Sequence, residues 1–227
     1  MSWTNRVLFV ACLLCGVLIT APVQASVVVG GTRLVYDASK RQVSLSLVNT
    51  DDGTDYLVQS WLDHQEEADE RPVPFVITPP LFRLDAKQES VLRVVYTGDE
   101  LPTDRESLYW LSVKSIAAVE RSAENRLQIA IRSRMKMFYR PAGLPGTAEE
   151  AHQAVQFSRQ GQRLIVTNPS AYFISFHTIK VGDIEIPEPG MVSPMDSHEW
   201  TLPSGADGRV TWQAINDYGA ISGIFSQ

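Results

Sequence analysis

The sequence predicts an all-β fold of two immunoglobulin-like β-sandwich domains, and three features support this class. Leu127–Met137 places apolar residues at alternate positions, interrupted only by Ser133, which is the pattern of a strand with one apolar face. Further short apolar segments are separated by turn residues, and no segment keeps a helical period. Short strands at this spacing are typical of immunoglobulin-like sandwiches, and 227 residues suffice for two of them.

The amino terminus predicts a cleaved export signal. Arg6 precedes the apolar run Val7–Ile19, and small residues that suit a cleavage site end at Ala25. The run is shorter than the ~20 residues that a membrane span needs. Cleavage after Ala25 removes both cysteines and one arginine, so the mature chain would have no disulfide and a net charge of -6 - 1 = -7.

Alternation of apolar and polar residues predicts strands throughout the rest of the chain. In the first half these are Val27–Val29, Leu34–Tyr36, Val43–Leu47, Tyr56–Leu62, Phe75–Ile77, Ser90–Tyr96 and Leu108–Ile116. In the second half they are Val155–Phe157, Leu164–Val166, Tyr172–Phe176, Ile179–Val181 and Val210–Ala214.

Proline and glycine after Arg140 mark the boundary between two domains. We expect a signal segment at 1–25, a first domain at 26–142 and a second domain at 143–227. Thr147–Ala154 is expected to form a short helical lead-in to the second domain. Thr78-Pro79-Pro80 must leave the sheet, because proline cannot donate to a strand ladder.

Charge and motif content disfavour several classes of function. A net charge of -6 gives no bulk attraction to nucleic acid or anionic lipid. The four histidines lie in different segments without metal-ligand spacing, and there is no nucleophile elbow, phosphate-binding glycine loop or paired-carboxylate motif. We therefore expect no enzyme activity, no metal site and no cofactor, which leaves binding proteins as the leading class.

The alternating strand Leu127–Met137 is open to two interpretations. Its polar face carries Arg132, Arg134 and Lys136, which require water or anions. The strand could be an ordinary core strand with a solvated cationic face, or an edge strand that offers its apolar row and its backbone to another chain. The residues alone favour the first interpretation.

Several segments together resemble the periplasmic pilus-assembly chaperones of the chaperone–usher pathway. In the order of that family they are Gly31–Tyr36, Ile77–Leu84, Leu101–Trp110, Phe138–Pro141, Thr167–Ser170 with Tyr172, and Ile215–Gly219. The chain departs from the family at Ala171, where relatives often have a second proline. The short segment Ala118–Asn125 resembles the short-loop subgroup of the family.

The resemblance implies two immunoglobulin-like domains in a boomerang arrangement with an interdomain cleft. It also assigns roles to residues of this chain. Arg33 and Lys136 match a basic pair that anchors the C-terminal carboxylate of a pilus subunit. Leu127, Ile129 and Ile131 match the alternating apolar residues that the chaperone donates to the open core of the subunit.

Two further sets of residues have structural roles in this interpretation. Glu106, Arg140 and Asp217 match an ion network between the two domains, which would fix the angle between them. Ser133 separates the donated row from Met135 and Met137, which we assign to the core of the protein itself.

The expected function is therefore that of a periplasmic chaperone without a cofactor. It would bind pilus or fimbrial subunits by donor-strand complementation and deliver them to an outer-membrane usher. Its exposed apolar row would favour self-association of the free protein. The alternatives are an immunoglobulin-like pilus subunit or adhesin, and a secreted carbohydrate-binding module. The absence of mature cysteines disfavours the first, and the scattered tryptophans disfavour the second.

Overall fold

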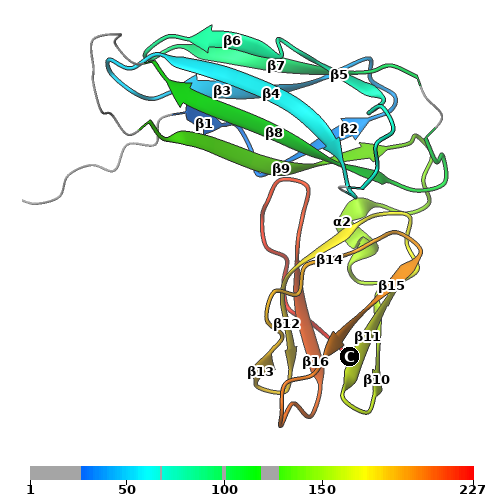
Figure 1. The fold of residues 1–227 in the computed structure, drawn as a ribbon. Helices are drawn as coiled ribbons and strands as arrows, with labels where there is room; N and C mark the ends of the chain where they lie inside the picture. Colours follow the sequence, from blue (N-terminus) through cyan, green and yellow to red (C-terminus); the bar gives the residue numbers. More distant parts are fainter. Residues whose placement is uncertain (1–26, 67, 99–100, 119–127) are drawn as a thin grey trace, which may run out of the picture.

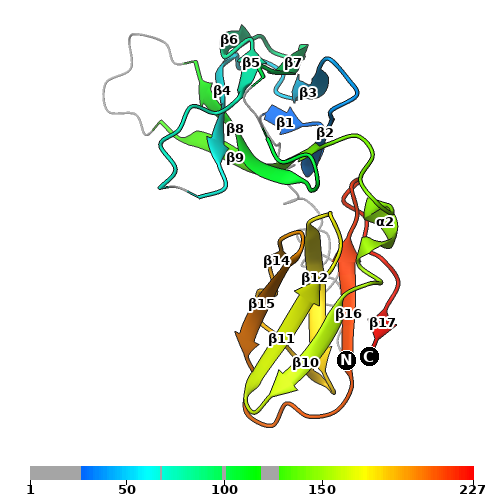
Figure 2. The same cartoon turned by 90° about the vertical axis from the view of Figure 1, so that its right-hand side faces the viewer.

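Two β-sandwiches make up the computed structural model, which describes residues 27–66, 68–98, 101–118 and 128–227. The sandwiches meet at a steep angle, with the second below one end of the first (Figures 1 and 2). The predicted fold class is confirmed. The expected signal segment and Leu127 lie outside the described residues.

Two sheets form the first sandwich. One sheet has the order β1-β3-β7-β5, with bounds Val27–Val29, Val43–Asn49, Glu89–Tyr96 and Phe75–Thr78. The other has the order β2-β9-β8-β4-β6, with bounds Arg33–Asp37, Ala130–Arg140, Ser107–Ala117, Tyr56–His64 and Leu81–Leu84. Strand β6 was not predicted, because it is a four-residue strand directly after the two prolines.

The chain crosses from one sheet to the other between β1 and β2. Gly30 and Gly31 make this crossing, and a Cβ atom at Gly30 would lie 2.1 Å from the Ser46 hydroxyl oxygen. Strand β1 pairs antiparallel with β3, whereas β2 pairs parallel with β9. The first strands of the chain therefore contribute to both sheets of the sandwich.

Strand β9 differs in its bounds from the strand expected at 127–137. It begins at Ala130 and continues to Arg140. Met135 and Met137 are buried in the core, as expected from the alternation. Phe138 is buried on the opposite face, where its ring lies 5.6 Å from that of Phe173 in the second sandwich. The second sandwich therefore buries this face of β9 near its end, so that apolar residues occur there on both faces. This explains why the strand continues beyond the end predicted from the alternation.

The second sandwich follows a short helix, α2, at Ala148–Ala151. This helix lies inside the lead-in predicted at 147–154, and the Thr147 hydroxyl caps it by accepting from the Glu150 N–H. One sheet has the order β10-β11-β15, at Gln156–Gln160, Arg163–Asn168 and Asp196–Thr201. The other has the order β13-β12-β16-β17, with β14 also on β12, at Ile184–Glu185, Ile174–Val181, Val210–Ile215, Phe225–Ser226 and Met191–Val192.

Two predictions for the second half of the chain need correction. The strands expected at 172–176 and 179–181 form one strand, β12, with an irregularity between Phe176 and Thr178. Strands β13, β14, β15 and β17 were not predicted. Strand β15 gives no alternating signal, because five of its six residues are exposed and most of them are polar.

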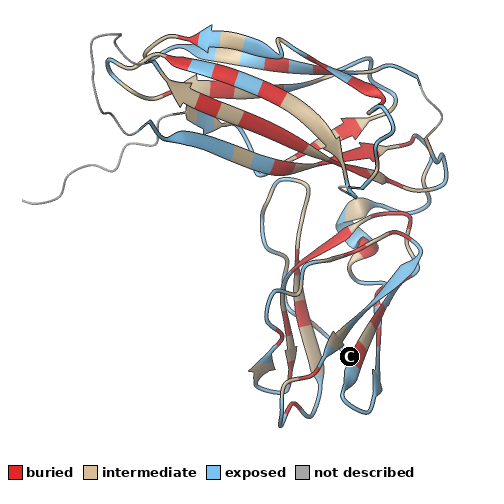
Figure 3. Cartoon of the chain, viewed as in Figure 1, coloured by how far each residue is buried: buried red, intermediate tan, exposed pale blue. Residues whose placement is uncertain are grey.

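Each sandwich has its own core (Figure 3). In the first, the rings of Tyr36, Phe75 and Tyr139 pack together at centroid distances of 5.5 to 5.8 Å. In the second, Trp212 lies 5.0 Å from Phe157 and donates its indole N–H to the His152 carbonyl. No helix within the described ranges is long and apolar enough to cross a membrane.

Candidate functional site

Strand β9 has a complete neighbour on one edge and a partial neighbour on the other. Strand β8 pairs with it along Ala130–Tyr139. On the opposite edge, β2 pairs only with Lys136–Arg140. Within the described part of the chain, the β9 edge at 130–135 has no strand partner. Such an edge presents unpaired backbone donors and acceptors to any extended chain that approaches it.

The side chains before and within this open edge carry the predicted apolar row. Ile129 and Ile131 are 67% and 52% exposed, although both are large apolar residues. Met135, further along the same alternation, is buried in the core. The third predicted member, Leu127, lies outside the described residues. The strand thus passes from an exposed apolar row to a buried one around Ser133.

Arg33 and Lys136 lie side by side where the open edge ends. They are register partners in the parallel pair of β2 and β9, although they are far apart in the sequence. Arg33 donates to the Ile215 carbonyl at 3.1 Å, and Lys136 donates to the Ser175 hydroxyl at 3.1 Å. Both cations therefore face the second sandwich.

The environment of this basic pair favours an additional anion. Among the described residues neither cation forms an ion pair, and the Arg33 Nε atom is buried without a hydrogen-bond partner. Burial and the nearby positive charge of Arg33 lower the pKa of Lys136 to about 8. Burial also lowers the pKa of Arg33, and the negative charge of Asp217 opposes this shift. A carboxylate between the two would stabilise both charges.

Arg140 joins the two sandwiches through two carboxylates. Its Nε atom donates to Glu106 at 2.6 Å, and its two terminal nitrogens donate to Asp217 at 2.8 and 3.0 Å. The predicted ion network thus has these three residues in direct contact. Burial acts to lower the pKa of Arg140, but the hydrogen bonds and charges of both carboxylates raise it overall. The role of the network in fixing the domain angle stays a prediction.

Glu106 is the most buried member of this network, with 3% of its surface exposed. Its second carboxylate oxygen accepts from the Phe173 N–H at 2.8 Å, and its own backbone N–H donates to the Ala171 carbonyl at 2.9 Å. Burial raises the pKa of Glu106, and the charge of Arg140 opposes that shift. One residue of the first sandwich therefore makes both backbone and side-chain contacts with the second.

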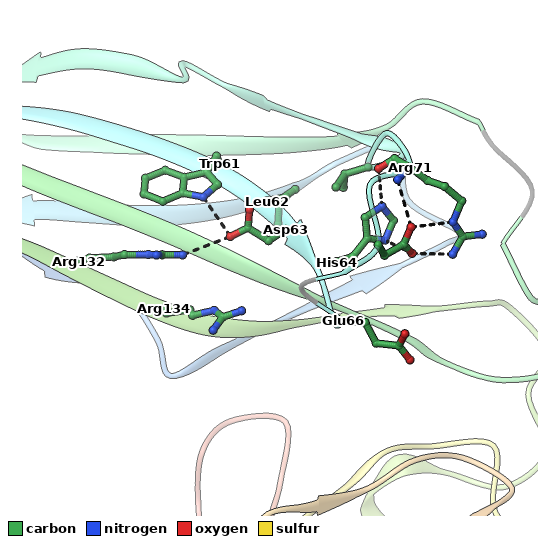
Figure 4. Close-up of a pocket in the computed structure, with 10 residues that line it drawn as sticks. Trp61, Leu62, Asp63, His64, Glu66, Arg71, Arg132 and Arg134 are labelled. Carbon is green, nitrogen blue, oxygen red and sulfur yellow. Dashed lines mark hydrogen bonds and ion pairs between the residues drawn. The ribbon is translucent and has the colours of Figure 1, made fainter.

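The cationic face of β9 packs on tryptophans, which the sequence interpretation did not anticipate. The Arg132 guanidinium lies 4.9 Å from the Trp61 ring centre, and that of Arg134 lies 4.4 Å from the Trp110 ring centre. Asp63 accepts from both Trp61 and Arg132 (Figure 4). Only strand register brings these residues together, so the sequence contained no local signal for the contacts.

Two hollows adjoin these elements. One, of about 460 Å³, is lined by Trp61, Arg132 and Arg134 among others (Figure 4). The other, of about 650 Å³, is lined by both sandwiches, including Tyr109 and Phe173, and forms a cleft between the domains. No group of three or more His, Cys, Asp or Glu side chains in the described ranges could hold a metal ion.

Family models cover most of the chain. The N-terminal domain of PapD, described as a pili and flagellar-assembly chaperone, matches residues 26–145, and the C-terminal domain of the PapD pili assembly chaperone matches residues 150–224. The probable fimbrial chaperone LpfB of Escherichia coli O157:H7 is 40% identical over 211 residues, covering 89% of this chain and 90% of the relative. The chaperone protein FimC of E. coli K12 is 37% identical over 220 residues, covering 93% and 90%.

Solved structures give the same result. A chain from the complex of the Salmonella enterica SafA pilin with the SafB chaperone superimposes with a TM-score of 0.81 at 33% identity, covering 91% of this chain and 98% of that one. The E. coli chaperone DraB gives a TM-score of 0.79 at 37% identity, covering 89% and 97%. Because both sequence and structure match over nearly the full length, the chain belongs to the PapD family of pilus assembly chaperones of the chaperone–usher pathway.

Proposed function

We propose that this protein is a periplasmic chaperone that lends strand β9 to pilus subunits and delivers them to an outer-membrane usher. The observation that carries the proposal is the open β9 edge at 130–135, which ends at the basic pair Arg33 and Lys136. The location in the periplasm follows from the export signal predicted at 1–25 and from the family.

The geometry of the edge favours one direction for an added strand. Strand β2 already runs parallel to β9 and starts at Arg33. A second parallel strand on the open edge would point toward β2, and its C-terminal carboxylate would arrive at Arg33 and Lys136. An antiparallel strand would bring an amino terminus to the same place, where two cations would repel it. The basic pair therefore selects a free C-terminus.

The apolar row supports capture of a subunit whose own core is open. Ile129 and Ile131 lie exposed beside the edge, so a strand added there would carry them into the partner's interior. The carbohydrate-binding alternative loses support, because Arg132 and Arg134 cover the faces of Trp61 and Trp110. A bare aromatic platform is therefore missing at these two positions.

Replacing Lys136 with methionine, or Arg33 with methionine, should abolish capture of a subunit while the chaperone stays folded. Each change removes a charge-assisted hydrogen bond to the carboxylate and keeps an unbranched apolar stem in place of the original one. The measurement is co-expression with a pilus subunit that the wild-type protein keeps soluble, followed by purification of the one-to-one complex.

The matched control is Lys180→Met, which removes an exposed strand lysine paired with Glu185. This control should retain the complex. Wild-type yields of complex from both Lys136→Met and Arg33→Met would rule out the proposed anchor. No complex between the wild-type protein and any subunit of its own fimbrial system would contradict the proposed function.

Subunit affinity should fall as the pH rises above about 8. The pKa of Lys136 is about 8 in the free protein, and a bound carboxylate would raise it because it favours the ammonium form. The affinity therefore has its full value well below pH 8, where Lys136 is protonated in the free protein. Above pH 8 the affinity falls by up to about tenfold per pH unit. Binding curves of the wild-type protein at pH 7 and pH 9 test this. Lys180→Met, which keeps Lys136 and the complex, is the control and should show the same loss of affinity as the wild type. A constant wild-type affinity over this range would contradict the role of Lys136.

A further inference from the structure

The loop between β16 and β17, residues 216–224, exposes an unusual set of apolar side chains. Tyr218 is 94% exposed, Ile224 is 74% exposed and Ile221 is 50% exposed. Single exposed apolar residues are normal on a protein surface, but three within one short loop indicate a contact surface. Nothing in the proposed anchor or in the donated strand uses these three side chains.

The loop is held in one shape by its own hydrogen bonds. The Asn216 side-chain oxygen accepts from the N–H groups of Tyr218 and Ala220 at 3.0 and 2.9 Å. The Asn216 N–H donates to the Ala220 carbonyl, and the Ser222 hydroxyl accepts from the Ala214 N–H. A loop that is already ordered loses little conformational entropy when a partner binds.

The loop is also fixed against the first domain at a specific place. Asp217 is bound by Arg140, and Gly219 adopts a φ of +83° beside Thr32. A Cβ atom at Gly219 would lie 2.5 Å from the Thr32 hydroxyl oxygen, so the two segments are in close contact. Thr32 directly precedes Arg33, and Figure 1 shows this loop reaching up to the underside of β9. The loop therefore lies where a strand added to β9 would end.

We propose that residues 216–224 form a second contact surface for the C-terminal segment of the bound subunit, through Tyr218, Ile221 and Ile224. This inference rests on the proposed function, because the added strand brings that segment to the loop. One face of the added strand would follow the apolar row of β9, and the other face would turn toward the second domain. The loop then recognises apolar side chains among the last residues of the subunit, just before its carboxylate.

On this basis the second domain contributes to the choice of subunit. The basic pair binds any free carboxylate, so it cannot distinguish one C-terminus from another. An apolar loop beside it can, because side chains that differ in size and polarity bury different areas against it.

The test replaces Tyr218, Ile221 and Ile224 together with serine and measures the dissociation constant for a subunit that the wild-type protein binds. We expect affinity to fall by about 10- to 100-fold, since exposed tyrosine and isoleucine side chains at an interface are replaced by small polar ones. The control replaces Val76, Val91 and Val95 with threonine. These apolar residues of β5 and β7 are also exposed, at 49%, 39% and 36%, although less than the three loop residues. It should bind like the wild type. If the triple serine protein fails to fold, Tyr218→Ala alone gives the same comparison.

A double-mutant cycle separates this inference from the proposed function. Alanine substitutions in the last residues of the subunit should lose their effect when the loop is already changed, because contacting residues couple. Unchanged affinity of the loop variant, together with loss of binding in Lys136→Met, would overturn the inference and leave the proposed function intact. A loop variant that binds subunits normally but fails only in transfer to the usher would also overturn it, and would assign the loop to the usher.

Discussion

Replacing Ile129 and Ile131 together with asparagine should leave the protein folded and lower its affinity for a pilus subunit by at least about 100-fold. Both side chains are more than half exposed in the free protein, so they contribute little to its own core. In a subunit they would become buried, and each fully buried side chain contributes about 1.5–3 kcal/mol. Loss of two such contributions corresponds to roughly 10²- to 10⁴-fold in affinity. The dissociation constant and the melting temperature are measured on the same preparation.

The matched control for this double variant replaces Val76 and Leu81 with asparagine. These residues are exposed to a comparable extent, at 49% and 56%, but lie on β5 and β6, away from the open edge. They should not change subunit affinity. If the Ile129/Ile131 variant binds as tightly as the wild type, β9 does not lend its apolar row, and the backbone edge alone would have to account for binding.

Replacing Arg140 with methionine should lower the free energy of unfolding by about 3–5 kcal/mol. The change removes the cation from between Glu106 and Asp217 and leaves the Glu106 carboxylate buried without a counter-charge. Removing one partner of a buried ion pair costs this much because the remaining charge is out of water and uncompensated. Urea unfolding, followed by fluorescence and by far-UV circular dichroism, gives the measurement.

Two further variants show whether the buried charge is the cause. Arg163→Met breaks an exposed pair with Glu199 and should cost no more than about 1 kcal/mol. Glu106→Leu combined with Arg140→Met removes the unpaired charge and should recover part of the loss. An Arg140→Met protein as stable as the wild type would show that Glu106 does not depend on this arginine.

The sequence predicts a strand best where one face is buried and the other face is exposed to solvent. The alternation at 43–47 and 90–96 lies within β3 and β7, in which buried residues alternate with exposed or partly exposed ones. Strand β15 lacks the pattern because nearly all of its residues are exposed, and β9 extends beyond its pattern because the second domain covers Phe138. In both cases tertiary packing, which no local window contains, decides the burial.

The candidate site depends even more on long-range register. Arg33 and Lys136 become neighbours only through the parallel pairing of β2 with β9, and from spacing alone each would be an ordinary surface charge. The family resemblance brought them together, whereas periodicity could not. Strand register also brings Arg132 onto the ring of Trp61. The family resemblance assigned no role to these two residues, so the contact was not predicted.

The parallel pairing of β2 with β9 also has a consequence for the order of folding. The first of these strands begins at Arg33 and the second ends at Arg140, so the sheet cannot close before more than a hundred residues of chain have emerged. Contacts between segments so far apart in the sequence form late, because closing such a long stretch of chain costs conformational entropy. The basic pair exists only after that closure. If the basic pair anchors a subunit's C-terminus as proposed, a nascent or partly folded copy therefore lacks this anchor until the first domain is complete.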